Sequence, residues 1–226
     1  MAAAAEIHGD KSVSCPEHVT STPTTTLTVK QKYWSYFKST GRGFTVTNAS
    51  SDNNDNNNNN NDDNPLLFAL STKSFGKRRC LEDTTGKALF NLERNWLSRR
   101  KAWVLKDPEG NTVFTVRLRW SKFRIKMEVE WKGLNPPGGG ESGGTRGGGV
   151  TVEGENVWHE RVRMLDGGCL MAEMRCTNTV GGILSSYKVT PPVWEVQVRE
   201  GVDLALVTVL AVCVSDIFSE GRVYMV

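Results

Sequence analysis

Asp203-Leu-Ala-Leu-Val-Thr-Val-Leu-Ala-Val-Cys-Val-Ser-Asp-Ile-Phe218 is the stretch that the rest of the chain must pack around. Between Leu204 and Val214 only Thr208 is polar. An apolar run without a polar stripe is typical of a helix that is buried on all sides. Its valines weakly favour a strand, but strands usually span about 4–8 residues, and the greater length of this run favours a helix. The segment therefore predicts a buried helix.

The residues at the two ends of this segment also fit a helix. The side chain of Asp203 is suited to cap the first turn. Gly221 follows the apolar run, and a glycine in the left-handed conformation there would end the helix. A membrane-spanning helix needs roughly 20 apolar residues, and this run is shorter. We therefore expect a helix surrounded by protein, and no transmembrane segment.

The remainder of the chain predicts strands joined by tight turns. Asp83-Thr-Thr-Gly86 and Asp107-Pro-Glu-Gly110 repeat one turn pattern, each followed by alternating apolar and polar residues. The Asp side chain can start such a turn, and the glycine takes the positive φ that ends it. A shortened third copy lies within 164–174. Because hairpins in series form an antiparallel meander, we expect a mainly β fold, a closed sheet around one buried C-terminal hydrophobic helix.

Three segments lack the side chains that build a core. Residues 1–25 predict a disordered tail, residues 50–64 are rich in Asn and Asp, and residues 133–149 are rich in Gly and Pro. With about 150 residues per domain as a prior, the chain predicts one domain over 26–226 that carries the last two segments as disordered insertions. Such insertions cost little stability, because the entropy of loop closure grows only logarithmically with length.

Basic residues gather in the middle of the chain, although the net charge of +3 is too small to indicate nucleic-acid binding. They concentrate at 73–79, at 94–101 and in the strand pair expected over 113–131. In that strand pair, period-two alternation places apolar side chains toward the core and basic ones outside. We call the outer set the basic stripe, and it is the candidate surface for an anionic lipid or a partner: Arg117, Arg119, Lys122, Arg124 and Lys126.

The basic stripe has more than one interpretation. It can be a solvated outer face, in which case Glu128 and Glu130 are expected to be cross-strand charge partners. A concentrated positive surface can instead bind anionic membranes, at about 1 kcal/mol per basic residue near the surface, or an acidic protein. Nucleic acid is disfavoured as a partner, because exposed aromatic residues for base stacking are not evident in the stripe.

The residues indicate neither a catalytic set nor a cofactor or metal site. His159 is the only histidine in the expected fold, so no Ser–His–Asp grouping and no histidine-based metal site is expected. The 5 cysteines show no CxxC spacing. No signal peptide is visible, so we expect reduced thiols and an intracellular, cytoplasmic protein, with membrane association or a nuclear location as alternatives.

The order of these features resembles a known family. Leu27-Thr-Val29, Gly43-Phe-Thr-Val46, the Asp-x-x-Gly turns and Gly201-Val-Asp-Leu-Ala205 together resemble the plant LURP-one-related family. That family belongs to the tubby-like C-terminal superfamily, which also contains the phospholipid scramblases. The resemblance covers roughly residues 26–226 and implies a closed antiparallel barrel of about a dozen strands, threaded by the C-terminal helix.

Three functional hypotheses follow from these residues and from the resemblance. The first is a non-enzymatic protein that acts in plant defence or stress response through an unknown protein partner. The second is a peripheral membrane module, since tubby proteins bind phosphoinositide head groups through basic residues outside the barrel, although no such residue is carried over to this chain one by one. The third, an enzyme or small-ligand carrier that uses the barrel interior, is disfavoured because the helix should fill that space.

Overall fold

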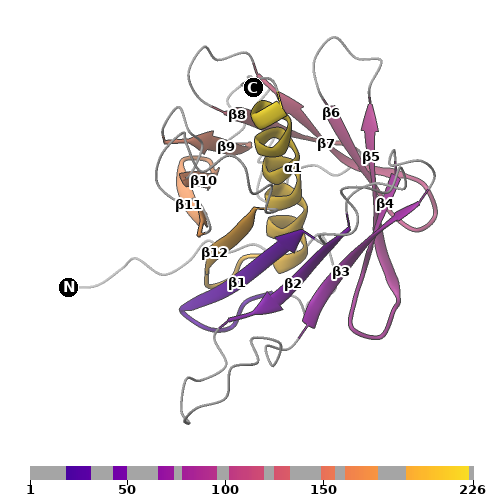
Figure 1. Ribbon diagram of the computed structural model, residues 1–226, viewed down its shortest axis with the longest axis horizontal. Coiled ribbons are helices and arrows are strands. Elements are labelled where there is room, and N and C mark those ends of the chain that lie inside the picture. The colour runs from indigo at the N-terminus through magenta and orange to yellow at the C-terminus, as the bar shows by residue number, and fades with distance from the viewer. Residues whose placement is uncertain are drawn as a thin grey trace, which may run out of the picture.

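The computed structural model describes residues 19–31, 43–49, 66–73, 78–95, 102–119, 125–132, 149–155, 161–177 and 192–223. Twelve strands in these residues form a closed antiparallel barrel around one helix, α1 (Leu204–Val223), as Figure 1 shows. Each strand pairs with the next in the chain, and β1 pairs with β12 to close the barrel. The expected fold is therefore confirmed. The strands are β1 (Thr24–Gln31), β2 (Phe44–Asn48), β3 (Leu66–Lys73), β4 (Arg78–Glu82), β5 (Ala88–Asn95), β6 (Ala102–Lys106), β7 (Thr112–Leu118), β8 (Lys126–Trp131), β9 (Val150–Gly154), β10 (Arg161–Asp166), β11 (Cys169–Cys176) and β12 (Val193–Arg199).

Helix α1 is the centre of the core. Every residue from Ala205 to Asp216 is buried, so no side of this part of the helix faces water. Oxygen Oδ1 of Asp203 accepts hydrogen bonds from the backbone N–H groups of Ala205 (2.8 Å) and Leu206 (3.2 Å), which confirms the expected cap. The expected end at Gly221 is wrong, because the helix continues to Val223. A glycine weakens a helix by about 1 kcal/mol without stopping it.

Along the strands, buried and exposed side chains alternate, so one face of the sheet points into the barrel and the other to solvent. In β12, Trp194, Val196 and Val198 are fully buried, whereas Gln197 and Arg199 are exposed. The same alternation brings apolar side chains from every strand onto α1, in one continuous core. Burying each large apolar side chain stabilises the fold by about 1.5–3 kcal/mol. This core, rather than any single contact, closes the barrel.

The predicted turns are present. Asp83 Oδ1 accepts hydrogen bonds from the N–H groups of Thr85 (2.8 Å) and Lys87 (3.0 Å), and Gly86 has φ +81°. Asp107 Oδ1 accepts one from the N–H of Asn111 at 2.7 Å. The third turn joins β10 to β11. All three form by local chemistry, which is why the sequence predicts them.

The ordered domain begins earlier than expected. Thr20 exchanges backbone hydrogen bonds with the β12–α1 connection, donating to Val202 (3.1 Å) and accepting from Gly201 (2.9 Å), and its hydroxyl donates to the carbonyl of Arg199 at 2.7 Å. Val19 forms a bridge with Asp203. The structure thus moves the start of the domain from Thr26 to Val19. The rest of the expected tail and the two insertions, apart from Gly149, lie outside the described residues.

Candidate functional site

The described part of the basic stripe lies on the outer face of β7 and β8, as expected. Arg117 Nε is 3.0 Å from Glu130 Oε2. Arg119 Nε donates a hydrogen bond to Glu128 Oε2 at 2.6 Å. Glu128 and Glu130 are thus cross-strand charge partners, as predicted.

The third described member of the stripe is also paired. Lys126 Nζ is 3.0 Å from Glu153 Oε1 on the neighbouring strand β9. Lys122 and Arg124 lie outside the described residues. The structure therefore brings three of the five candidate residues together, each beside a carboxylate.

This pairing changes what the stripe can do. Three described cations face three carboxylates, so the local charge is balanced, and the hydrogen bond to Glu128 raises the pKa of the Arg119 guanidinium. The arginine side chains are 47% and 42% exposed. Exposed ion pairs contribute only about 0–1 kcal/mol each. An anionic ligand can replace these carboxylates, but it meets no unpaired cation among the three described members of the stripe.

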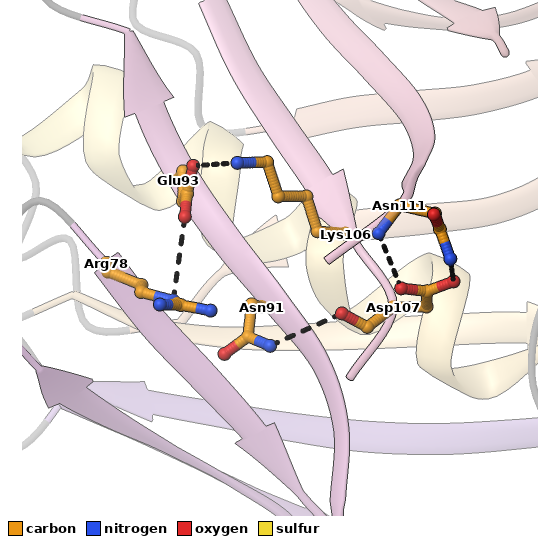
Figure 2. Close-up of polar contacts among 6 residues, drawn as sticks. All are labelled: Arg78, Asn91, Glu93, Lys106, Asp107 and Asn111. Carbon is orange, nitrogen blue, oxygen red and sulfur yellow. Dashed lines mark hydrogen bonds and ion pairs between the residues drawn. The ribbon is translucent and has the colours of Figure 1, made fainter. Parts of the chain in front are cut away.

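A second outer network joins β4, β5 and β6, and Figure 2 shows its members. Glu93 is shared by two cations: its Oε1 lies 3.5 Å from Arg78 Nε and its Oε2 lies 2.6 Å from Lys106 Nζ. Nearby, the Asn91 side chain donates to the carbonyl oxygen of Asp107 at 3.5 Å, and the Asn111 side chain donates to the Asp107 carboxylate at 2.8 Å. These contacts hold adjacent strands and one turn together.

One arginine of the 73–79 cluster points inward, which sequence reasoning missed. Arg79 is only 9% exposed, and its guanidinium binds the Asp216 carboxylate of α1 through two hydrogen bonds of 2.6 and 2.9 Å. Trp103 Nε1 donates to the same carboxylate at 3.3 Å, and the guanidinium lies 5.3 Å from the ring centre of Phe44. The alternation of β4 was the available signal, since Arg79 shares a face with buried Leu81.

The ion pair between Arg79 and Asp216 attaches α1 to the barrel wall, and its charged groups are not free to bind a substrate. Both charges of the pair are engaged in a bidentate contact, which is the geometry that a buried arginine and carboxylate need. Burial raises the pKa of the Cys213 thiol well above its usual value, so this thiol is protonated at neutral pH. A protonated thiol is a poor nucleophile.

The described residues lack the features of a metal site and of a membrane-spanning helix. No cluster of three or more His, Cys, Asp or Glu side chains among them is placed to hold a metal ion. No helix in this part of the chain is long and apolar enough to cross a membrane. All three histidines, His159 included, lie outside the described residues.

Comparison with known proteins places the chain in a family. A family model described as LURP-one-related matches residues 25–216. The structure resembles the X-ray structure of a protein from Arabidopsis thaliana, with a TM-score of 0.56 and 16% sequence identity over 92% of this chain and 98% of the other. At that identity the likeness concerns the fold alone. No curated protein sequence matches this chain.

Proposed function

The chain belongs to the LURP-one-related family, and on that premise we propose that it is a non-enzymatic, intracellular binding module. It acts in plant defence or stress responses through a protein partner that docks on the outside of the barrel. The observation that carries the proposal is the filled interior, because α1 is buried on every side from Ala205 to Asp216.

The filled interior supports an outer binding surface in two steps. Small-molecule sites are usually concave pockets lined by apolar side chains with a few polar groups. Here the inward side chains of the strands pack against α1 in one core, and the buried carboxylate of Asp216 is already bound by Arg79 and Trp103. The buried ion pair is thus engaged within the core, whereas the charged side chains on the outside of the barrel are exposed and weakly paired. Recognition on the outside requires no change in the core.

The test uses plants that lack this protein and are complemented with variants of it. Each variant carries two charge changes on the outer face of one pair of neighbouring strands, and each is first shown to melt at the wild-type temperature. We expect the wild type to restore resistance to a pathogen and at least one outer variant to fail. Full complementation by all outer variants, or turnover of a small molecule by the purified chain, would overturn the proposal.

A second candidate function is peripheral binding to anionic phospholipids through the basic stripe. It is favoured by the position of Arg117, Arg119 and Lys126 side by side on the outer face. Each cation is in an exposed ion pair, in which a lipid phosphate can replace the carboxylate. Co-sedimentation with phosphoinositide vesicles at low and high salt tests it. The matched variant reverses Arg117, Arg119, Arg124 and Lys126 to Glu. Salt-sensitive binding that this variant loses would support the membrane role, and no binding at low salt would end it.

A further inference from the structure

Two neighbouring arginines on β10 and β11 differ from the other described cations of the barrel wall. Arg161 lies directly opposite Arg175 in the register of these strands. Both are exposed. Directly opposed side chains have their Cβ atoms about 4.5–5.5 Å apart, and like charges in that position destabilise the sheet. The barrel therefore places two positive charges side by side on its outer face.

Elsewhere on the wall a carboxylate neutralises such crowding. Arg78 also lies opposite a basic residue, Lys73, but it pairs with Glu93. For Arg161 and Arg175 no ion pair or side-chain hydrogen bond to any described residue is present. Glu155, the residue after β9, donates its backbone N–H to the carbonyl of Arg161, but its carboxylate pairs with Arg163. Glu195 lies opposite Arg175 on β12 but forms no ion pair with it, so no carboxylate of the described wall binds either guanidinium.

The chemistry of the pair selects an oxyanion. Each guanidinium presents a planar fork of N–H donors, and two adjacent forks match the several oxygens and the double negative charge of a phosphate monoester. A single carboxylate satisfies one fork, as Glu128 does for Arg119.

The surroundings of the pair favour a phosphorylated protein segment over a membrane. Glu195 lies opposite Arg175 in the register of β11 and β12, and Glu173 lies on the same outer face of β11. Neither carboxylate forms an ion pair with a described residue, and Glu195 accepts only a 3.4 Å hydrogen bond from the side chain of Gln197. A broad anionic membrane would be repelled by these carboxylates. A phosphate followed by basic side chains would match both signs of charge.

The outer face gives such a segment a path. From Arg161 the registers run in one row across Arg175 and Glu195 to Thr28 on β1, and from there to Thr47 on β2. The far end of the row carries uncharged hydroxyl groups. In Figure 1, β10 and β11 lie on the opposite side of α1 from β4 and β5, so the arginine pair is remote from the network of Figure 2.

We propose that Arg161 and Arg175 form a docking site for a phosphoserine or phosphothreonine in an extended segment of a partner protein, with lysine or arginine next to the phosphorylated residue. The phosphate is held between the two guanidinium groups, and the adjacent basic side chains lie against Glu173 and Glu195. The inference rests on the proposed function and names the chemistry of the partner.

The test measures fluorescence anisotropy of two matched peptide libraries with the full chain. Both libraries have basic residues around a central serine, which is phosphorylated in only one of them. We expect the wild type to bind the phosphorylated library, and Arg161→Ala or Arg175→Ala to weaken binding about tenfold or more, because each removes a charged hydrogen-bonding partner. Arg199→Ala is the control, since Arg199 is an exposed arginine that lies opposite Thr24, and it should bind like the wild type.

A neutral substitution separates binding from folding. Arg175→Gln removes one of the two opposed charges without placing a carboxylate opposite Glu195, so this variant should melt close to the wild-type temperature while it loses the phosphopeptide. Equal binding of both libraries, or unchanged binding by the Arg161 and Arg175 variants, would overturn the proposal. Binding to phosphoinositide vesicles that depends on these two arginines, without binding to the peptides, would assign the site to a membrane instead. In that case the complementation test still decides whether the chain acts through its outer surface.

Discussion

Asp216 and Glu128 are both carboxylates bound by an arginine, but Asp216 lies inside the barrel and Glu128 lies outside it. Asp216 is 2% exposed and accepts two hydrogen bonds from Arg79 and one from Trp103. Glu128 has a side chain that is 31% exposed and accepts from Arg119 alone at 2.6 Å. Removing one partner of a buried pair costs about 3–5 kcal/mol, whereas an exposed pair contributes about 0.2–1 kcal/mol.

This difference explains how the two faces of the same β-sheet can have different roles, the inner one in stability and the outer one in binding. On the inner face, a charge without its partner cannot be hydrated, so Arg79 and Asp216 depend on each other. On the outer face, water compensates for a lost contact, so charges can change partner at little cost to the fold. We therefore expect substitutions inside to change stability, and substitutions outside to change binding.

The largest expected effect comes from removing helix α1 from the barrel interior. A chain that ends before Asp203 lacks α1 and leaves the inward side chains of all twelve strands without their central packing partner. We expect this truncated chain to show no cooperative thermal unfolding and to be insoluble. Circular dichroism during heating checks this, with the full chain as the control. A truncated chain with a normal cooperative melt would show that the wall is stable alone.

The inner ion pair is expected to give the next largest effect. Asp216→Ala leaves the Arg79 guanidinium buried without its carboxylate, so the melting temperature should fall by roughly 10 °C, on the order of 3–5 kcal/mol for a domain of this size. The double variant Arg79→Met with Asp216→Leu removes both charges and should recover most of that loss. If both single and double variants melt like the wild type, the pair is not the attachment that the geometry implies.

The outer pair should respond much more weakly. Glu128→Gln removes the charge that Arg119 binds but keeps the shape of the side chain, and the stability should fall by less than about 1 kcal/mol. Chemical denaturation of this variant beside Asp216→Ala gives the comparison directly. A loss at Glu128 as large as the loss at Asp216 would remove the distinction between the two faces.

The smallest expected effect concerns pH and one outer turn. The hydrogen bond from the Asn111 side chain is the main cause that lowers the pKa of the Asp107 carboxyl. A group whose pKa is lower in the folded chain contributes stability that is present above its unfolded pKa and lost as the pH falls through the folded pKa. Between about pH 5 and pH 2 the wild type should therefore lose slightly more stability than Asp107→Asn. Parallel losses in the two proteins would contradict this.

Features set by neighbours in the chain were predictable, and features set by distant partners were not. The cap at Asp203 and the turn at Asp83 use atoms within four residues of each other, so both can be predicted from the local sequence. The inward position of Arg79 depends on Asp216, 137 residues away. Strand β9, Val150–Gly154, was missed because only five residues carry it and a glycine-rich segment precedes it.

The candidate site divides in the same way. Alternation placed Arg117, Arg119 and Lys126 on the outer face, and it indicated Glu128 and Glu130 as their partners. The partner of Lys126 was not predicted, because Glu153 belongs to β9. The opposition of Arg161 and Arg175 likewise depends on the register between two strands, which the turn that joins them sets.

The pattern of residues along the chain was enough to predict a β-barrel built around the C-terminal helix. A long apolar segment without a polar side must be enclosed, and serial hairpins with alternating residues are the wall that can enclose it. Which charges are neutralised and which are not became visible only in the folded arrangement of the strands. The reason is that an ion pair depends on the distance between atoms of different strands, and that distance is set by register and closure.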